Sequence, residues 1–157
     1  MQSPVKKELP DFLKPQNHWM IGDYLPNITI DPQSSLKLYD LIDRYLIVAV
    51  VSTTCAPCLE AMEIVNEFIE SFPGYRLVIL IETDDETFER AKEAFHESAL
   101  LYHVPDRVLV EELKIFGYPW SYGINIEGQI IAHATCGVRR MFMNVVEPFH
   151  RFHREIR

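Results

Sequence analysis

The stretch Val48-Ala-Val-Val-Ser-Thr-Thr-Cys55-Ala-Pro-Cys58 places a Cys-x-x-Cys motif directly after an apolar run and directly before a helical pattern. Two cysteines at this spacing can close a small disulfide loop. A helix that begins at the first cysteine points unpaired backbone N–H groups and the positive end of its dipole at that sulfur, which favours the thiolate. Because the thiolate is the nucleophilic form of cysteine, the motif indicates redox chemistry at Cys55 and Cys58.

The composition of the 157-residue chain is typical of one globular domain with a sizeable core, because 48% of the residues are hydrophobic and 24% are charged. The net charge of -8, from 23 acidic and 15 basic side chains, argues against a polyanion partner such as nucleic acid. Three cysteines fit one reactive pair and one further thiol. We expect a monomer that works without a bound cofactor or metal.

Residues 1–18 carry three prolines among lysine and glutamate, which predicts a poorly ordered N-terminal lead. The folded domain is expected over residues 19–157. No apolar stretch reaches the roughly 20 residues that a membrane span needs, and the lead has no signal-peptide pattern. We expect a cytoplasmic protein if the chain is complete.

The first half of the chain alternates strand and helix patterns. The continuous β-branched run 46–51 predicts a strand buried on both faces. A helix is expected over 58–72, then a strand over 77–81 and an amphipathic helix over 84–101. The apolar face of the first helix is expected to carry Leu59, Met62, Val65, Phe68 and Ile69. Strands joined through helices indicate an α/β sheet, whose site lies beyond the carboxyl ends of its parallel strands.

The second half of the chain predicts a hairpin between two helical segments. Residues 108–116 are expected to form a short helix. The runs 121–126 and 129–134, joined through Glu127-Gly128, indicate a hairpin. A final helix is expected over 138–152, with Pro148 either kinking or ending it.

With Cys55-Ala-Pro-Cys58, a proline just before a late hairpin and this order of elements, the chain resembles the thioredoxin fold, a central mixed sheet flanked by helices. The segment Ile21-Gly-Asp-Tyr-Leu-Pro-Asn-Ile28 resembles one shared by peroxiredoxins of the AhpC/TSA type and TlpA/ResA-type thiol-disulfide oxidoreductases. Tyr118-Pro119-Trp120, followed by Ile124-Asn-Ile-Glu-Gly-Gln-Ile-Ile131, is similar to the cis-proline and hairpin of those families.

This resemblance implies a thiol-disulfide oxidoreductase, with reduction favoured over oxidation, that acts on protein cysteines and is recycled by an upstream redox partner. It implies that Cys55 attacks, that Cys58 resolves, and that Pro119 is cis beside the pair, leaving a backbone edge for an extended substrate peptide. It also implies an extracytoplasmic, membrane-tethered protein if an anchor precedes the chain. The implied substrate-contact residues are Ala56, Pro57, Tyr118, Pro119, Trp120 and Gly137.

Several positions depart from the family pattern. Thr54 replaces the tryptophan that usually precedes the first cysteine, which thins the apolar rim around the site. Ala49 and Ala61 stand where related proteins carry proton-relay acids. Glu60 or Glu63 could serve instead from the helix, and Glu63 also replaces a proline that commonly kinks it.

Three alternatives to disulfide exchange remain open at the sequence level. A peroxiredoxin-like thiol peroxidase fits the shared leading segment and Thr54, although the proline and threonine set around a single peroxidatic cysteine is missing. A zinc site would have only two of the four ligands it needs. A fold with idle cysteines would be a non-enzymatic module that holds a peptide in the same groove.

Other chemistry-bearing residues have plain structural interpretations. Cys136 could form an alternative disulfide or tune the site, but packing is favoured. His150 and His153 are interpreted as part of a solvated face. The aromatic rings of Tyr118 and Trp120 fit substrate contact and core anchoring equally. The acidic residues Glu82, Asp84, Asp85 and Glu86 are interpreted as the first-turn cap of a helix rather than as a cation site.

Overall fold

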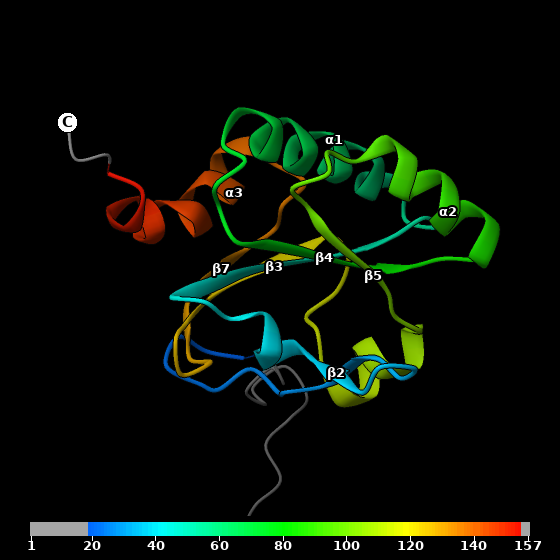
Figure 1. The fold of residues 1–157 in the computed structure, drawn as a ribbon, viewed down its shortest axis with the longest axis horizontal. Helices are drawn as coiled ribbons and strands as arrows, with labels where there is room; N and C mark the ends of the chain where they lie inside the picture. The colour runs from blue at the N-terminus through cyan, green and yellow to red at the C-terminus, as the bar shows by residue number, and fades with distance from the viewer. Residues whose placement is uncertain (1–18, 155–157) are drawn as a thin grey trace, which may run out of the picture.

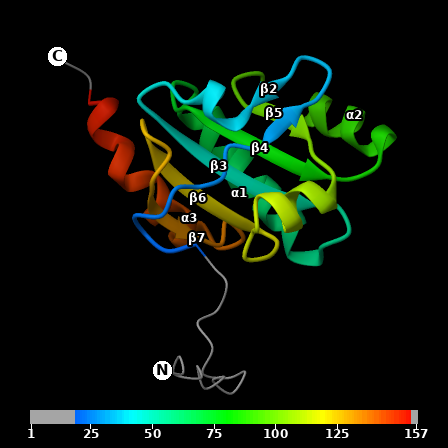
Figure 2. The same cartoon turned by 90° about the horizontal axis from the view of Figure 1, so that it is seen from below.

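The computed structural model describes residues 19–154, so the lead predicted for residues 1–18 lies outside the described residues. Its centre is a five-stranded mixed sheet with the order β5-β4-β3-β6-β7 (Figure 2). The central strand β3 (Tyr45–Ser52) pairs in parallel with β4 (Leu77–Glu82) and antiparallel with β6 (Trp120–Asn125). The outer strands are β5 (Leu100–His103), parallel to β4, and β7 (Ile130–Ala134), antiparallel to β6.

Both faces of the sheet are covered, as the sequence predicts for an uninterrupted apolar strand. All eight residues of β3 are buried, and alternate residues belong to two different apolar clusters. One cluster joins the sheet to the helices α1 (Ala56–Ser71) and α3 (Arg139–Val146), which lie above it in Figure 1. The other cluster joins it to the leading segment, including the small hairpin β1 (Thr29–Asp31) and β2 (Leu36–Lys37) and the short helix η2 (Leu38–Leu41).

The first helix begins directly after the first cysteine, as the position of the motif predicts, and so precedes the helical spacing of residues 58–72. Cys55 is the N-cap of α1, and Pro57 lies in the first turn, where the missing N–H of proline costs no helical hydrogen bond. The helix therefore starts at Ala56 rather than Cys58. Leu59 is expected on its apolar face but is 69% exposed, so that assignment is wrong. The inner face instead presents Cys58 and Ala61 to the sheet.

The predicted helix over residues 84–101 is wrong in its second half. α2 (Asp85–Ala94) stops after ten residues, and Leu100 opens the edge strand β5. The apolar spacing of Ala91, Phe95 and Ala99 continues the helical pattern past the end of α2. The backbone nevertheless leaves the helix at Phe95, and the next residues pair with β4 in parallel register. Tertiary pairing thus overrides a local pattern at the sheet edge.

The predicted hairpin is confirmed as β6 and β7. The helix expected before it is one wide turn of π-type helix, η3 (Val108–Glu112), on the face opposite α1. The final α-helix ends at Val146, and a 3-10 helix, η4 (Glu147–Phe152), continues the chain. Pro148 was predicted either to kink the last helix or to end it. It lies in the first turn of η4, so the α-helix ends there.

Candidate functional site

The two cysteines of the motif differ sharply in exposure. Cys55 is half-buried at the N-terminus of α1, whereas Cys58 has no exposed surface. Cys58 lies one turn into the helix, where its backbone N–H donates to the Cys55 carbonyl at 3.1 Å. Burial, together with a hydrogen bond between the two thiols, raises the pKa of Cys58 to about 12. The arrangement offers one accessible sulfur at the positive end of a helix dipole and holds a second, protonated sulfur behind it.

The strand register brings distant segments to the cysteine pair. Ser52 is paired with Glu82, so β3 and β4 end side by side, and Val50 is paired with Trp120, so β6 begins at the same edge. β7 ends there too, because Ser121 is paired with Ala134. The loops that follow or precede these strand ends therefore meet around Cys55, as expected for a site beyond the carboxyl ends of parallel strands.

Three of the predicted contact residues meet closely beside the pair. The Tyr118–Pro119 peptide bond is cis, as the resemblance implied. A Cβ atom at Gly137 would lie 3.1 Å from the Pro119 Cγ and 3.7 Å from the Pro57 carbonyl oxygen, so glycine permits this close approach. Thr135, which was not predicted from the sequence, ties the loops together: its hydroxyl donates to the Pro119 carbonyl at 3.0 Å and accepts from the Gly137 N–H at 3.1 Å.

The two aromatic residues beside Pro119 are both half-buried. The Tyr118 hydroxyl donates to Asp106 Oδ1 at 2.8 Å, and its pKa is raised by burial, then by Asp106, Glu82 and Cys58. Trp120 stacks on Phe116, with ring centroids 4.4 Å apart. Tyr118 is thus tied to the loop that carries Asp106, while Trp120 continues into the sheet as the first residue of β6.

The acids expected to assist the cysteines lie elsewhere. Ala49 and Ala61 are fully buried, and Glu60 and Glu63 are both exposed on α1. A different acid, Glu82, lies beside the motif instead, although the sequence predicted no role for it there. Its carboxylate accepts a hydrogen bond from the Ser52 hydroxyl at 2.6 Å.

This hydrogen bond belongs to a small network next to the cysteine motif. The Ser52 hydroxyl also lies 2.9 Å from the hydroxyl of Thr54, which is itself exposed, and the Ser52 N–H donates to Cys58 Sγ at 3.3 Å. Ser52 and Glu82 are the last residues of two adjacent strands. Aligning the ends of the two predicted apolar runs would have placed them together.

Cys136 lies in the core, in keeping with the packing interpretation. Its side chain has no exposed surface, and its thiol donates to the Trp120 carbonyl oxygen at 3.4 Å. Burial raises the pKa of Cys136, and the nearby thiols of Cys58 and Cys55 raise it further. The third thiol is therefore near the pair, in a protonated and sheltered state.

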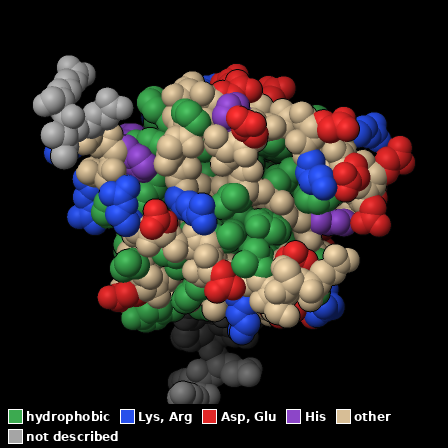
Figure 3. Space-filling model, in the orientation of Figure 1, with side chains coloured by type: hydrophobic (Ala, Val, Ile, Leu, Met, Phe, Trp, Pro, Cys, Tyr) green, Lys and Arg blue, Asp and Glu red, His purple; other side chains and the backbone are tan. Residues whose placement is uncertain are grey.

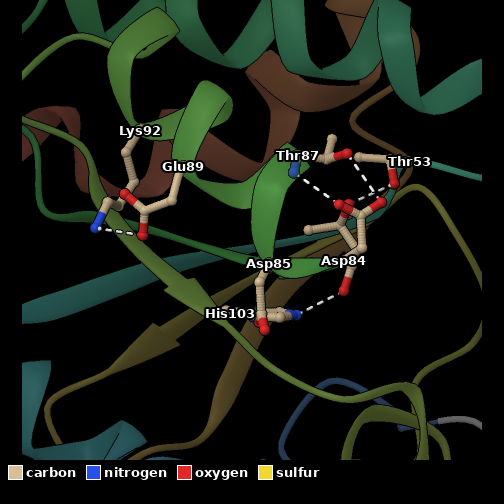
Figure 4. Close-up of polar contacts among 8 residues, drawn as sticks. Thr53, Asp84, Asp85, Thr87, Glu89, Lys92 and His103 are labelled. Carbon is tan, nitrogen blue, oxygen red and sulfur yellow. Dashed lines mark hydrogen bonds and ion pairs between the residues drawn. The ribbon is translucent and has the colours of Figure 1, made fainter.

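The acidic cluster is only in part a helix cap. Asp84 caps α2, accepting from the Thr87 N–H at 2.7 Å and hydroxyl at 2.9 Å (Figure 4), and those bonds lower the pKa of Asp84. Asp85 and Glu86 occupy the first turn, whereas Glu82 belongs to β4 and the site, so its assignment to the cap is wrong. Figure 3 shows acidic side chains gathered over the end of the molecule that carries α2. Within residues 19–154, no three histidine, cysteine or acidic side chains gather as metal ligands.

The two C-terminal histidines are not part of a solvated face, so that interpretation is wrong. His150 Nδ1 is hydrogen-bonded to the Tyr75 hydroxyl, and His153 Nε2 to the Tyr45 hydroxyl. Both imidazoles are half-buried against these rings, at the end of the sheet opposite the cysteines. Their tyrosine partners lie far away in the sequence, so helical spacing alone could not reveal them.

The fold that carries this site is thioredoxin-like, a mixed sheet flanked by helices. Similar solved structures include a thioredoxin-like protein in its oxidised form (TM-score 0.65, 16% identity, 83% of this chain and 97% of that chain). Another is a thio-disulfide isomerase from Thermus thermophilus (TM-score 0.64, 14% identity, 87% and 99%). A third is a thiol:disulfide interchange protein from Bacteroides sp. (TM-score 0.60, 22% identity, 87% and 94%).

The similarity is one of structure rather than of sequence. No protein-family profile matches the chain, and no curated protein sequence matches it. At these identities the comparison shows the fold alone, and the neighbours that share it are named for thiol-disulfide chemistry. In the part of the chain that the structure describes, no helix combines the length and the apolarity needed to cross a bilayer.

Proposed function

We propose that this protein is a thiol-disulfide oxidoreductase that exchanges disulfides with protein substrates through Cys55 and Cys58. The observation that carries the proposal is the asymmetry of the pair: Cys55 is half-exposed at a helix N-terminus, and Cys58 is buried one turn behind it, with its thiol hydrogen-bonded to Cys55. A nucleophile must be reached by its substrate, whereas a resolving thiol must be reached only by its partner.

The chemistry has two exchange steps. The Cys55 thiolate attacks one sulfur of a substrate disulfide, forming a mixed disulfide and releasing one substrate sulfur as a thiolate, which takes up a proton. Cys58 then loses its proton to solvent and attacks Cys55 Sγ, which releases the second substrate thiolate. The substrate gains two electrons, and the protein is left with a Cys55–Cys58 disulfide. A separate reductant must supply two electrons to restore the dithiol.

The loops around Cys55 provide the proposed peptide-binding edge. We assign this edge to the backbone around the cis bond between Tyr118 and Pro119, and Gly137 keeps the space between Pro119 and the Pro57 carbonyl free of a side chain. An extended peptide can bind such an edge by adding a strand. Ala56, Tyr118 and Trp120 flank the same edge, and we assign them to substrate contact.

We further place the protein in the TlpA/ResA-type branch, acting as a reductase. The segment Ile21–Ile28 and the hairpin after Pro119 support this placement by resemblance. In the fold, the segment runs beside that hairpin, because Gly22 N–H donates to the Ile130 carbonyl and Ile130 N–H donates to the Asp23 carbonyl, both at 2.8 Å.

The test is the equilibrium reduction potential of the Cys55–Cys58 pair in glutathione or dithiothreitol buffers, combined with an insulin-reduction assay. Potentials of related pairs range from about -270 mV for a reductant to about -120 mV for a strong oxidant. We expect a value near the reducing end, insulin turnover in the unaltered protein, and none in Cys55→Ser. Cys58→Ser should instead accumulate the mixed disulfide with substrate.

Other results would favour the alternatives. A potential near the oxidising end would replace the reductase with an oxidant or isomerase. Consumption of hydrogen peroxide without insulin turnover would indicate a thiol peroxidase. If no reversible two-electron couple appeared, the oxidoreductase proposal would fail, and a peptide-binding module would be the better description.

A further inference from the structure

The resolving thiol lies in surroundings that oppose its ionisation. Cys58 has no exposed surface, and its raised pKa comes first from burial and then from its hydrogen bond with Cys55. The Ser52 N–H, 3.3 Å from Cys58 Sγ, has the opposite effect and lowers the pKa of Cys58. A hydrogen bond to a charged sulfur is stronger than one to a neutral thiol, so this N–H stabilises the thiolate that the second exchange step requires.

The position of that N–H is fixed through the Ser52 side chain. Ser52 is 1% exposed, and its hydroxyl donates to Glu82 Oε2 at 2.6 Å. The Glu82 backbone contributes as well, because its carbonyl accepts from the Thr53 N–H at 3.1 Å. On the other side, the Thr54 N–H donates to the Ser52 hydroxyl at 3.3 Å. The turn between β3 and Cys55 is thus held to β4 at Glu82.

The other nearby acids do not take this place. Glu60 and Glu63 lie on α1 without a hydrogen bond to the Ser52 network, Asp84 is engaged in capping α2, and Asp106 accepts the hydrogen bond of Tyr118. The ionisable groups that face Cys58 are the thiols of Cys55 and Cys136 and the Tyr118 phenol, and Tyr118 is in turn influenced by Glu82. None of these three is a carboxylate, so Glu82 is the acid linked to this sulfur through hydrogen bonds.

We propose, building on the proposed oxidoreductase function, that Glu82 is a positioning residue for the resolution step. Its carboxylate accepts the Ser52 hydroxyl hydrogen bond and thereby holds the Ser52 N–H on Cys58 Sγ. When Cys58 releases its proton to solvent, that N–H stabilises the thiolate, whose electron pair attacks Cys55 Sγ and expels the substrate sulfur. Glu82 thus supports the second exchange step and leaves the first attack by Cys55 unchanged.

The experiment isolates the second step by using 5,5′-dithiobis(2-nitrobenzoate) as the substrate disulfide. Its reaction with Cys55 releases one nitrothiobenzoate, and attack by Cys58 releases a second, so the two steps are separated in time by absorbance. We would compare Glu82→Ala, Glu82→Gln, Ser52→Ala and the Ser52→Ala/Glu82→Ala double variant across neutral and alkaline pH. Glu86→Gln is the matched control, because it removes the same charge from an exposed position at the start of α2.

Glu82→Ala and Ser52→Ala are expected to slow the second release about tenfold at neutral pH, which is the effect expected for the loss of one hydrogen bond to a charged group. Both variants should also move the pH midpoint of the second release upward. The double variant should be no slower than either single variant, because both remove the same link. Glu82→Gln keeps an oxygen acceptor and should retain the rate to within about threefold. The first release should be unchanged throughout.

Three outcomes would overturn the inference. An unaltered second release in Glu82→Ala would remove any role for the carboxylate. Equal losses in Glu82→Gln and Glu82→Ala would assign the effect to the charge of Glu82 rather than to positioning. Additive losses in the double variant would show that Glu82 does not act through Ser52. Failure of the proposed function is distinct, because the unaltered protein would then give no second release at all, and this inference would fall with it.

Discussion

The central strand β3 begins and ends in two regions of opposite character. At its start, the Tyr45 ring stacks on Phe149, with centroids 4.4 Å apart, and its hydroxyl bonds His153 and accepts from the Arg76 N–H at 3.0 Å. At its end, Ser52 is hydrogen-bonded to one hydroxyl, one carboxylate and one thiol, those of Thr54, Glu82 and Cys58. One end of the strand is closed by aromatic rings, and the other is held by small polar groups beside a half-exposed sulfur.

This difference separates stability from chemistry along a single strand. The aromatic end contributes buried apolar area and ring contacts, which stabilise the folded state most strongly. The cysteine end contributes hydrogen bonds, whose net effect on stability is smaller but whose geometry is specific. Substitutions at the aromatic end should therefore change stability and leave the cysteines reactive. Substitutions at the cysteine end should do the reverse.

The largest expected effect is that of Phe149→Ala. Phe149 is 1% exposed between Tyr45 and β6, where Gly123 leaves room for the ring: a Cβ at Gly123 would lie 2.6 Å from Phe149 Cε2. Truncating a buried phenylalanine costs about 3–5 kcal/mol. Urea unfolding should show this loss, while the rate at which folded molecules react at Cys55 stays unchanged. A loss of thiol reactivity in proportion to stability would contradict the separation of the two ends.

Much of this architecture could be predicted because its sequence signals lie within short stretches of the chain. Strands buried on both faces appear as continuous apolar runs, so the predicted ranges of β3 and β4 match the structure almost to the residue. The cysteine pair and Pro119 could be recognised because the Cys-x-x-Cys motif and the proline before the hairpin are short patterns. Strand β5 escaped prediction because it is a half-buried edge strand whose apolar residues extend the pattern of α2.

The features that escaped prediction at the two ends of β3 depend on contacts between distant residues. Glu82 belongs to the site only because parallel register pairs it with Ser52, 30 residues earlier. His153 is half-buried because it is hydrogen-bonded to Tyr45, a partner 108 residues away in the sequence. Only the alignment of two apolar runs that end at Ser52 and Glu82 could have indicated the first contact, and the local sequence around His153 carries no sign of the second. The site chemistry and the stability of the aromatic end are thus set by the topology of the sheet.

The next effect is a loss of stability in alkaline solution. Burial raises the pKa of Cys58 from an ordinary 9.0 to about 12, and that of Tyr45 from 10.0 to about 12. These groups stay protonated in the folded protein at pH values where the unfolded chain ionises, so the stability they contribute is fully present below about pH 9 and is lost as the pH rises toward 12. Between its pKa in the unfolded chain and its pKa in the folded protein, each such group lowers the free energy of unfolding by about 1.4 kcal/mol per pH unit.

This titration separates the buried thiols from the buried tyrosines, because the thiols of the unfolded chain begin to ionise about one pH unit before its tyrosines. Urea unfolding of the reduced protein at a series of pH values is the measurement. Cys58→Ser should make the decline that begins near pH 9 less steep without removing it, because buried Cys136, whose pKa is also raised, still contributes. Tyr45→Phe should reduce the slope only above pH 10, where Tyr118 and Tyr122, whose pKa values are also raised, still contribute. A decline that begins at neutral pH, or one that neither variant alters, would show that other groups control alkaline stability.

The smallest effect is expected at Gly137, where a single methyl group tests the geometry of the cysteine end. In Gly137→Ala the new Cβ, 3.1 Å from the Pro119 Cγ and 3.7 Å from the Pro57 carbonyl oxygen, should displace the proline ring by a few tenths of an ångström. We expect insulin turnover to fall three- to tenfold, equivalent to about 1 kcal/mol. Reaction of Cys55 with a small disulfide, which needs no peptide-binding edge, should be unchanged.

Val138→Ala is the matched control for this change, because Val138 is the next residue and is 46% exposed. Its insulin turnover should equal that of the unaltered protein. If Gly137→Ala slowed the small disulfide and insulin equally, the methyl group would be acting on the sulfur rather than on the peptide edge. Equal insulin turnover in Gly137→Ala and Val138→Ala would instead mean that substrate approaches Cys55 from another side. The hydrogen bonds around Ser52 would then define the reactive end of the sheet, and the close contact of Pro57, Pro119 and Gly137 would have no part in it.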